Sequence, residues 1–363
     1  MVNRCHHASR SASHPLPGRL RHAAPPFAGA RSAMRLPPLV LFLCVLLTLA
    51  PARASDVPLR DGQRLAGEVA GERLPLWPDG QVPGQSAPAR KARVVERSPD
   101  PAHPDRFVDG IDAPYMIVHA PPRPNGQAVL VIPGGGYQRV VIDKEGSALV
   151  PDWVQRAGFT LFVLRYRLPQ PGRDRQAALA DAQRALRVVR DQAARRGLEA
   201  DNVAVMGFSA GGHVAARLAT GFDAPVYPAR DAIDQLSARP ARAVLVYPVI
   251  DMGAHAHSGS RGRLLGERPD PALATQYSVQ EHVRADMPPT MLIHANDDRV
   301  VSVHNSEVMA QALARAGVEH ELHVFAHGGH GFGMRLQPGS TLAQWPALAQ
   351  AWLTAGKDAE RSR

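Results

Sequence analysis

Short apolar runs alternate along the chain with stretches in which apolar residues recur every three or four positions. The clearest helical pattern places Leu179, Leu186 and Val189 on one face, with polar residues between them, and this spacing is typical of an amphipathic helix. Gly197 marks its end. The short apolar runs predict buried strands. Strands are expected at 115–119, 128–132, 159–166, 203–206, 243–247, 291–295 and 319–325, and helices at 145–157, 179–193, 209–220, 306–316 and 342–353.

Strands that alternate with helices of this length indicate an α/β domain, which we expect to span 105–355. Such an order favours a mostly parallel sheet with helices on both faces. Two segments, 221–240 and 252–286, break the alternation and are expected to lie over the functional site. The segment 55–104 is rich in Pro, Gly and charged residues, which predicts an extended arm with one strand near 93–96.

The beginning of the chain predicts export. Residues 34–54 combine a positive start, an apolar run at 39–50 and an Ala-Arg-Ala ending, the three parts of a secretory signal peptide. The run is shorter than the ~20 residues of a membrane-spanning helix. Residues 1–33 match neither a leader nor a domain and are interpreted as a non-native or disordered extension; residues 356–363 are interpreted as a charged tail. We expect a secreted or periplasmic protein that starts at Ser55, without a membrane anchor after cleavage.

The charge of the chain is concentrated in the part expected to be removed. The whole chain carries a formal charge of +9, but residues 1–54 contain seven arginines and no lysine or acidic residue, which leaves 35 basic and 33 acidic side chains. This balance, with only 5% aromatic residues, argues against a nucleic-acid partner. Both cysteines, Cys5 and Cys44, lie in the same segment, so the exported chain is expected to contain no disulfide. The sequence gives no indication of oligomeric state.

A nucleophile is predicted where a strand meets a helix. Residues 207–211 spell Gly-Phe-Ser-Ala-Gly, directly after the strand 203–206 and at the start of the helix 209–220. The tight strand-to-helix turn of a G-x-S-x-G motif presents the serine hydroxyl at the carboxyl edge of the sheet, where the helix N-terminus favours an anion. A glycine-rich turn with an incidental serine would not require these flanking elements. Ser209 is therefore the predicted nucleophile.

A second glycine-rich loop supplies candidate donors for an oxyanion. Residues 132–137 spell Ile-Pro-Gly-Gly-Gly-Tyr and follow the strand 128–132, the position of the oxyanion loop in many esterases. The backbone N–H groups of Gly135, Gly136 and Ala210 are the predicted donors. A phosphate-binding loop is the alternative, but the Gly-Lys-Ser/Thr that such a loop requires does not follow.

The general base is expected among four histidines near the end of the chain. His330 lies in a Gly-Gly-His-Gly-Phe loop beyond the last strand, where a base can reach back to the serine, and His327 is the second candidate. His320 and His323 lie within the strand 319–325, where structural roles are more common. A zinc site made by these histidines is disfavoured, because the strand spacing places His320 and His323 on opposite faces and no H-E-x-x-H motif is present. We expect no metal and no cofactor.

The acid that orients the base is expected after the strand 291–295. Asp297 and Asp298 are adjacent there, and the residue pattern alone does not choose between them. In the alternative interpretation both belong to a solvated turn and neither carboxylate reaches a histidine.

The motifs together resemble the bacterial acetylxylan-esterase-like α/β hydrolases, relatives of the prolyl-oligopeptidase-like esterases, over residues 75–353. The resemblance implies an α/β-hydrolase fold and assigns the acid to Asp298. Two departures near that position are Ala295, where glycine is usual, and Ser302, where proline is usual. The motifs that carry the resemblance are the glycine loop at 132–137, Lys-Glu-Gly at 144–146, Leu-Arg-Tyr-Arg-Leu-Pro at 164–169, Gly-Phe-Ser-Ala-Gly-Gly-His at 207–213 and Gly-Gly-His-Gly-Phe-Gly at 328–333.

The expected function is that of a serine carboxylesterase with Ser209, Asp298 and His330 as its triad. The resemblance implies that it removes acetyl or other short acyl esters from xylan or xylo-oligosaccharides. An esterase or peptidase for another acyl group is the nearest alternative, because the fold does not fix the leaving group. A glycoside hydrolase needs two carboxylates that flank the scissile bond, which adjacent aspartates do not supply. A non-catalytic binder would not need an intact triad.

Overall fold

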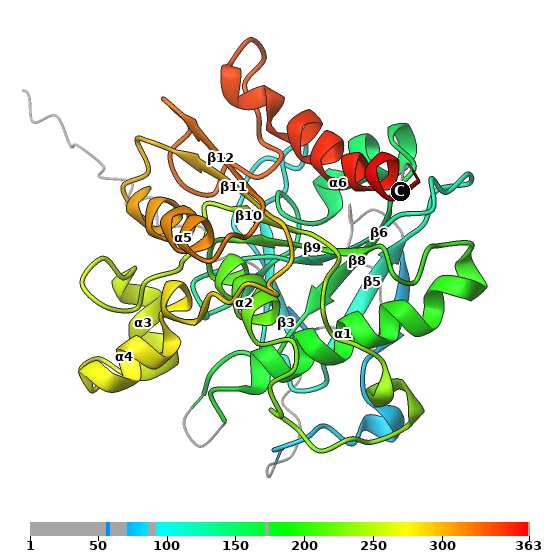
Figure 1. Ribbon diagram of the computed structural model, residues 1–363, viewed down its shortest axis with the longest axis horizontal. Coiled ribbons are helices and arrows are strands. Elements are labelled where there is room, and N and C mark those ends of the chain that lie inside the picture. The colour runs from blue at the N-terminus through cyan, green and yellow to red at the C-terminus, as the bar shows by residue number, and fades with distance from the viewer. Residues whose placement is uncertain (1–55, 59–70, 86–91, 171–173, 362–363) are drawn as a thin grey trace, which may run out of the picture. The chain divides into compact units, whose positions relative to one another are not determined.

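An eight-stranded sheet forms the centre of the protein in the computed structural model (Figure 1). The structure describes residues 56–58, 71–85, 92–170 and 174–361, so the expected N-terminal extension and signal peptide lie outside the described residues. In spatial order the strands are β12 (His320–Phe325), β11 (Thr290–Ala295), β10 (Ala243–Val246), β9 (Val203–Phe208), β6 (Ala128–Ile132), β8 (Thr160–Arg165), β5 (Tyr115–His119) and β2 (Glu72–Pro75). The strands from β12 to β8 are parallel, whereas β5 is antiparallel to β8 and β2 is antiparallel to β5.

Both faces of this sheet are covered, which explains why its central strands are continuously apolar. On β6, Leu130 and Ile132 belong to one core, whereas Val129 and Val131 belong to the other. The first core also contains residues of α1 (Ala177–Ala193), α2 (Ser209–Thr220) and α5 (His304–Arg315), and the second those of a π-helix (Val150–Arg156) and α6 (Trp345–Arg361). The predicted α/β-hydrolase fold, a mostly parallel sheet between helices, is confirmed.

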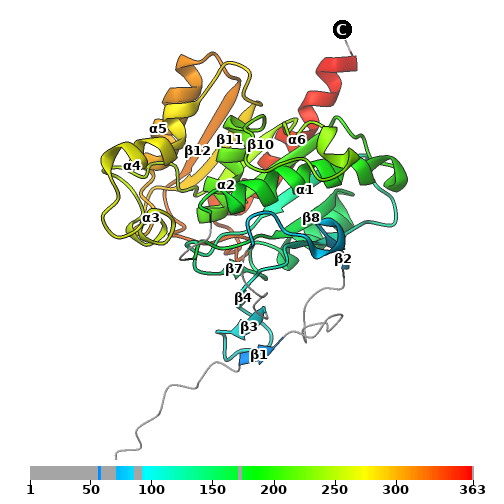
Figure 2. The ribbon, with the colours of Figure 1, turned by 90° about the horizontal axis from the view of Figure 1, so that it is seen from below.

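The described parts of the segment 55–104 contribute strands to two sheets and do not form a simple extended arm. The edge strand β2 extends the central sheet, and the strand expected at 93–96 is present as β3 (Arg93–Glu96). A smaller antiparallel sheet has the order β1 (Asp56–Pro58), β3, β4 (Arg106–Asp109) and β7 (Val140–Val141) (Figure 2). Trp77, in the short 3₁₀ region that includes Pro78–Gly80, is buried and donates its Nε1–H to Asp181 at 3.1 Å.

Two expected elements differ in detail. The helix expected at 145–157 is a 3₁₀ turn (Ser147–Leu149) followed by the π-helix. Pro151, near the start of that π-helix, has no N–H for an ordinary helical hydrogen bond. The expected charged tail at 356–363 continues α6 through Arg361, because its Ala, Lys, Glu and Arg residues are good helix formers.

The expectation that 221–240 lies over the functional site is wrong. This segment, with a 3₁₀ turn (Ala232–Gln235), connects the end of α2 to the start of β10, and such a connection runs at the edge opposite to the carboxyl ends of the strands. It packs on α1, where Arg184 forms ion pairs with Asp231 at 2.6 Å and Asp234 at 2.9 Å.

The segment 252–286, in contrast, leaves the carboxyl end of β10. It contains α3 (Ser258–Leu265), α4 (Pro271–Tyr277) and a 3₁₀ turn (Val279–His282). We call it the cover segment. Within the described ranges, no helix has the length and apolar character needed to cross a membrane.

Candidate active site

The turn between β9 and α2 places Ser209 in a strained position. Its φ of 52° lies in the left-handed region, which non-glycine residues adopt at a cost and mainly at functional sites. A Cβ atom on Gly207 would lie 2.5 Å from the Cβ of Ala215, and one on Gly211 would collide with the carbonyl oxygen of Ile132. The two glycines of the motif are therefore required by the close approach of the helix to the neighbouring chain.

The structure brings Ser209, His330 and Asp298 together. The Oγ of Ser209 lies 2.8 Å from Nε2 of His330, and Nδ1 of His330 lies 2.7 Å from Oδ2 of Asp298. Because an ionised carboxylate only accepts, Nδ1 must carry the ring proton of neutral His330. Nε2 is then left as the acceptor for the serine hydroxyl, so the arrangement selects the tautomer that a general base needs.

Asp298 is buried and held by several donors. Its Oδ1 accepts the N–H groups of Val300 and Val301, each at 2.9 Å, and Nε2 of His294 lies 3.3 Å from Oδ2. Burial alone would raise the pKa of Asp298, but the hydrogen bonds from His294, His330 and Val301 overcome it and hold the pKa well below its usual value. The Asp298 carboxyl is therefore ionised throughout the neutral and mildly acidic pH range.

Asp297 has a different role in the same loop region. Its Oδ1 accepts the N–H groups of Gly328 at 2.9 Å and Gly329 at 2.8 Å, and its Oδ2 lies 3.4 Å from Nδ1 of His327. These bonds lower the pKa of Asp297, the one from Gly329 most. The carboxyl anchors the loop that carries His330 but forms no hydrogen bond with that residue in the structure.

The three glycines after β6 are not equivalent. The N–H of Gly134 donates to Oε2 of Glu145 at 2.7 Å and is therefore occupied. Among the described residues, the N–H groups of Gly135 and Gly136 have no acceptor, and both residues adopt positive φ. Ala210 is the second residue of α2, where a helix leaves its N–H without an intrahelical acceptor. Among the described residues the N–H groups of Gly135 and Gly136 are thus free, and the place of Ala210 at the helix N-terminus leaves its N–H available as well.

Glu145 connects two loops of the site. It is buried, and besides Gly134 it accepts the hydroxyl of Tyr247 at 3.1 Å. That hydroxyl in turn accepts the N–H of Gly333 at 3.1 Å, and the Tyr247 ring packs against the His330 ring at 5.0 Å between centroids. One carboxylate therefore helps to fix the glycine loop after β6 relative to the loop that carries His330.

A second buried connection joins the glycine loop to α2 and to the cover segment. The Tyr137 hydroxyl lies 2.6 Å from Nδ1 of His213, and Nε2 of His213 lies 2.8 Å from the carbonyl oxygen of Tyr277. A carbonyl only accepts, so Nε2 carries the proton and the Tyr137 hydroxyl donates to Nδ1. Burial, assisted by the charge of Arg217, lowers the pKa of His213 to about 3, so the ring stays neutral.

The remaining histidines of the C-terminal region are dispersed. His320 bonds the carbonyl of Val318, and His323 bonds Glu321. Among the described residues, no group of three or more His, Cys, Asp or Glu side chains is placed to hold a metal ion.

Three residues that support the site, His294, Tyr137 and Tyr247, were not predicted from the sequence. His294 lies on β11 four residues before Asp298, and Tyr137 directly follows the glycine run. Their short distance in sequence from a predicted site residue could have indicated both. Tyr247 had no signal that a linear pattern reveals, because its partner Glu145 lies 102 positions away.

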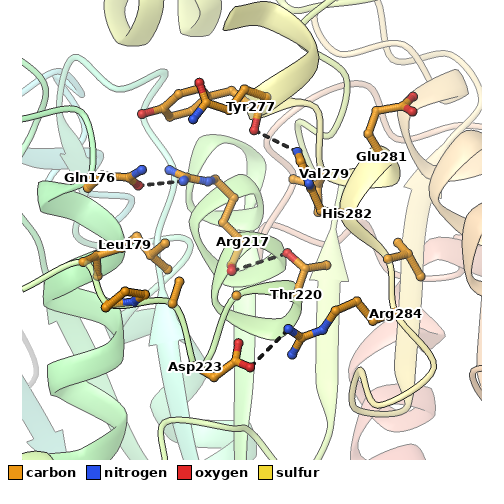
Figure 3. Close-up of a pocket in the computed structure, with 16 residues that line it drawn as sticks. Gln176, Leu179, Arg217, Thr220, Asp223, Tyr277, Val279, Glu281, His282 and Arg284 are labelled. Carbon is orange, nitrogen blue, oxygen red and sulfur yellow. Dashed lines mark hydrogen bonds and ion pairs between the residues drawn. The ribbon is translucent and has the colours of Figure 1, made fainter.

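A separate pocket of about 680 Å³ lies beside the ends of α2 and α4 (Figure 3). Its lining contains none of the predicted site residues. The charged groups in it are largely paired, since Arg217 donates to Gln176 at 2.7 Å and Arg284 pairs with Asp223 at 3.1 Å. Tyr277 and Arg217 connect this pocket to the site, because the Tyr277 carbonyl accepts from His213 and the charge of Arg217 helps to lower the pKa of His213.

Comparison with known sequences assigns the chain to a family. The sequence pattern that defines the BD-FAE family matches residues 116–313. The chain belongs to the BD-FAE family. The match begins in β5 and ends in α5, and so includes the glycine loop, the Ser209 turn and Asp298.

Two curated relatives of the chain have names that refer to xylan. An acetylxylan esterase from Xylanibacter ruminicola is 36% identical over 223 residues, which are 60% of this chain and 43% of that protein. An endo-1,4-beta-xylanase B from Butyrivibrio fibrisolvens is 34% identical over 205 residues, 56% of this chain and 32% of that protein. The chain thus spans less than half the length of these curated relatives.

Two solved structures share the fold of this chain. An acetyl ester-xyloside bifunctional hydrolase from Caldicellulosiruptor lactoaceticus is 34% identical and superimposes with a TM-score of 0.65, over 78% of this chain and 96% of that one. A carboxylesterase from Lactobacillus plantarum, 23% identical with a TM-score of 0.55 over 73% of this chain and 98% of that one, shows the same fold.

Proposed function

We propose that the protein is a serine carboxylesterase that removes acetyl and other short acyl groups from xylan or xylo-oligosaccharides. The observation that carries this proposal is the continuous hydrogen-bonded line from Asp298 through His330 to Ser209, with distances of 2.7 and 2.8 Å. These distances are within the range in which a base can take the proton of a nucleophile.

In this mechanism Ser209 attacks the ester carbonyl carbon while Nε2 of His330 takes the hydroxyl proton. Asp298 keeps the Nδ1–H tautomer and stabilises the imidazolium that forms. The tetrahedral intermediate collapses when His330 returns the proton to the sugar oxygen, which leaves as an alcohol. Water then enters, gives its proton to His330 and attacks the acyl-enzyme, so that acetate is released and Ser209 regains its proton.

The oxyanion would be held by the N–H groups of Gly135, Gly136 and Ala210. Their lack of protein acceptors and their place beside the nucleophile support this role; the Cβ position of the adjacent Gly134 is only 2.8 Å from the Cβ of Ser209. Such donors stabilise the charge that develops in the transition state without later reorganisation.

The substrate class rests on the relatives. The acetylxylan esterase and the acetyl ester-xyloside hydrolase support acetylated xylan as the substrate. An esterase or peptidase for another acyl group remains the second candidate, since the same triad serves many leaving groups.

Export is part of the proposal. Residues 34–54 support a signal peptide, and an enzyme that acts on a plant polymer must reach it outside the cytoplasm. Mass spectrometry of the exported protein is expected to find Ser55 at its N-terminus; retention of Cys44 would contradict the cleavage.

Acetate and reducing sugar released from acetylated xylan, measured side by side, test the assignment. The wild type is expected to release acetate only, and Ser209→Ala to lower kcat by about 10⁴- to 10⁶-fold while folding normally. A fluorophosphonate is expected to label the wild type at Ser209 and to leave the variant unlabelled. Acetate release by Ser209→Ala within tenfold of wild type would refute the nucleophile, and reducing sugar as the main product would favour a glycoside hydrolase.

A further inference from the structure

The cover segment places one histidine beside the glycine loop of the site. His257 immediately precedes α3, and its Cε1 lies 4.0 Å from the position that a Cβ atom would occupy on Gly136. The ring is half-buried and packs over Gly259, whose hypothetical Cβ would be only 3.1 Å from the same Cε1. The imidazole thus lies between the start of α3 and a predicted oxyanion donor.

The protonation of His257 follows from its capping role. The backbone N–H of Ser260 donates to Nδ1 at 3.2 Å, and the Ser260 hydroxyl lies 2.9 Å from the same atom. A backbone N–H can only donate, so Nδ1 must be an acceptor and the neutral ring carries its proton on Nε2. Burial and the neighbouring His330 lower the pKa of His257, although Asp298 opposes them. The ring therefore offers one neutral N–H donor.

This donor is unused within the protein and firmly held. Among the described residues, Nε2 of His257 has no hydrogen-bond partner. The segment that leads to it is fixed by Asp251, which accepts the N–H groups of Gly253 at 2.9 Å and His255 at 2.8 Å, and by Arg261, which donates to the Gly253 carbonyl at 3.0 Å. The donor is therefore oriented before any substrate arrives, which reduces the entropic cost of using it.

The residues around His257 indicate which part of an ester substrate would lie near its Nε2–H. The N–H groups of Gly135, Gly136 and Ala210 already serve the carbonyl oxygen in the proposed mechanism. Ser258 and Gly259, next to His257, are exposed, so this side of the site opens to solvent, where the rest of a polymer must extend. A sugar there presents hydroxyl, ring and ester oxygens, all of which accept hydrogen bonds.

We propose that Nε2–H of His257 donates a hydrogen bond to an oxygen of the sugar that carries the scissile acetyl group, and so favours carbohydrate esters over simple esters. This inference rests on the proposed esterase function. One hydrogen bond between neutral groups is expected to change kcat/KM by about 3- to 10-fold.

Two substitutions separate this role from helix capping. In His257→Asn the side-chain oxygen can still accept the Ser260 N–H, since asparagine is a good N-cap, but the side chain is too short to replace Nε2–H. In His257→Gln the amide nitrogen reaches further and restores a donor near the position of Nε2, while the cap is weakened.

The experiment compares kcat/KM for an acetylated xylo-oligosaccharide and for nitrophenyl acetate. We expect His257→Asn to lose about 3- to 10-fold on the sugar ester and less than twofold on nitrophenyl acetate, with an unchanged melting temperature. His257→Gln should retain more sugar-ester activity than His257→Asn. The inference is overturned if His257→Asn loses equally on both substrates, if it loses nothing on the sugar ester, or if His257→Gln is the more impaired variant on that ester.

Failure of the underlying function gives a different result. In that case the wild type itself would not hydrolyse nitrophenyl acetate, or Ser209→Ala would hydrolyse it equally well. Neither result depends on residue 257.

Discussion

The adjacent carboxylates Asp297 and Asp298 provide the sharpest test of the proposed site, because the same small substitution should have very different effects at the two positions. In Asp298→Asn the amide oxygen can keep the bonds from Val300 and Val301, and the amide NH₂ then faces Nδ1 of His330. Nδ1 must accept, so the proton moves to Nε2, which can no longer take the Ser209 proton. A wrong tautomer of this kind lowers kcat by about 10⁴-fold.

Asp297→Asn is the matched control. Both loop N–H groups, from Gly328 and Gly329, donate to the same oxygen of Asp297, and an asparagine oxygen in that place accepts both. The change removes the negative charge and replaces the oxygen that lies 3.4 Å from His327 with an amide NH₂, and the His327 side chain is exposed. We expect kcat to stay within about fivefold of wild type, because most substitutions at exposed positions change the free energy only slightly.

Both variants would be assayed with nitrophenyl acetate at a pH where the wild type is fully active, with circular dichroism to check folding. Equal loss in the two variants, or a larger loss in Asp297→Asn, would show that the hydrogen-bonded line through Asp298 is not the one that orients the base.

Three further outcomes are expected. Tyr137→Phe leaves Nδ1 of buried His213 without its donor, at a cost of about 1–3 kcal/mol. It should lower kcat by a larger factor than it changes KM, and the pH profile of kcat should not move, because His213 stays neutral above about pH 3. Gly211→Ala should prevent folding, since its Cβ would collide with the Ile132 carbonyl; a soluble variant with a wild-type melting temperature would contradict this. Because the pKa of Asp298 is lowered in the folded protein, its ionised carboxyl stabilises the folded state at pH values above the usual pKa of 3.8. This contribution is lost progressively as the pH falls from there towards the lowered pKa. The urea midpoint should therefore drop between pH 5 and pH 3, and drop less in Asp298→Asn.

Local patterns predicted most of the central sheet and the elements around the site. Strands such as 128–132 were found with their observed bounds, because a strand buried on both faces is a continuous apolar run. The turn at Ser209 was also predicted from the sequence, since both glycines that it requires lie within the five residues 207–211. Ser209 directly follows β9, and Asp298 and His330 lie in the loops that leave β11 and β12; parallel strands bring their carboxyl ends to one edge.

What the sequence did not predict depends on distant partners or on topology. The edge strand β2, with its exposed residues and Pro75, lacks the apolar signal of a buried strand. The segment 221–240 was wrongly expected at the site, because a loop-like sequence does not show at which edge of the sheet the loop lies. The His213 ring bonds Tyr137, 76 positions earlier, and the chain near Tyr277, 64 positions later, and no local pattern records either pairing.

The bond from His213 to the chain at residue 277 has a consequence for anyone who would redesign the enzyme by exchanging its cover segment. The acceptor is a main-chain carbonyl, so this bond depends on the path of the backbone at position 277, whereas the Tyr277 side chain is buried for its own packing with Arg217. A transplanted segment with a different backbone path, however, would leave the buried Nε2–H of His213 without an acceptor and would loosen the loop that Tyr137 holds. Grafts should therefore be selected by how their backbone passes over His213, and their sequence identity to the native segment matters far less.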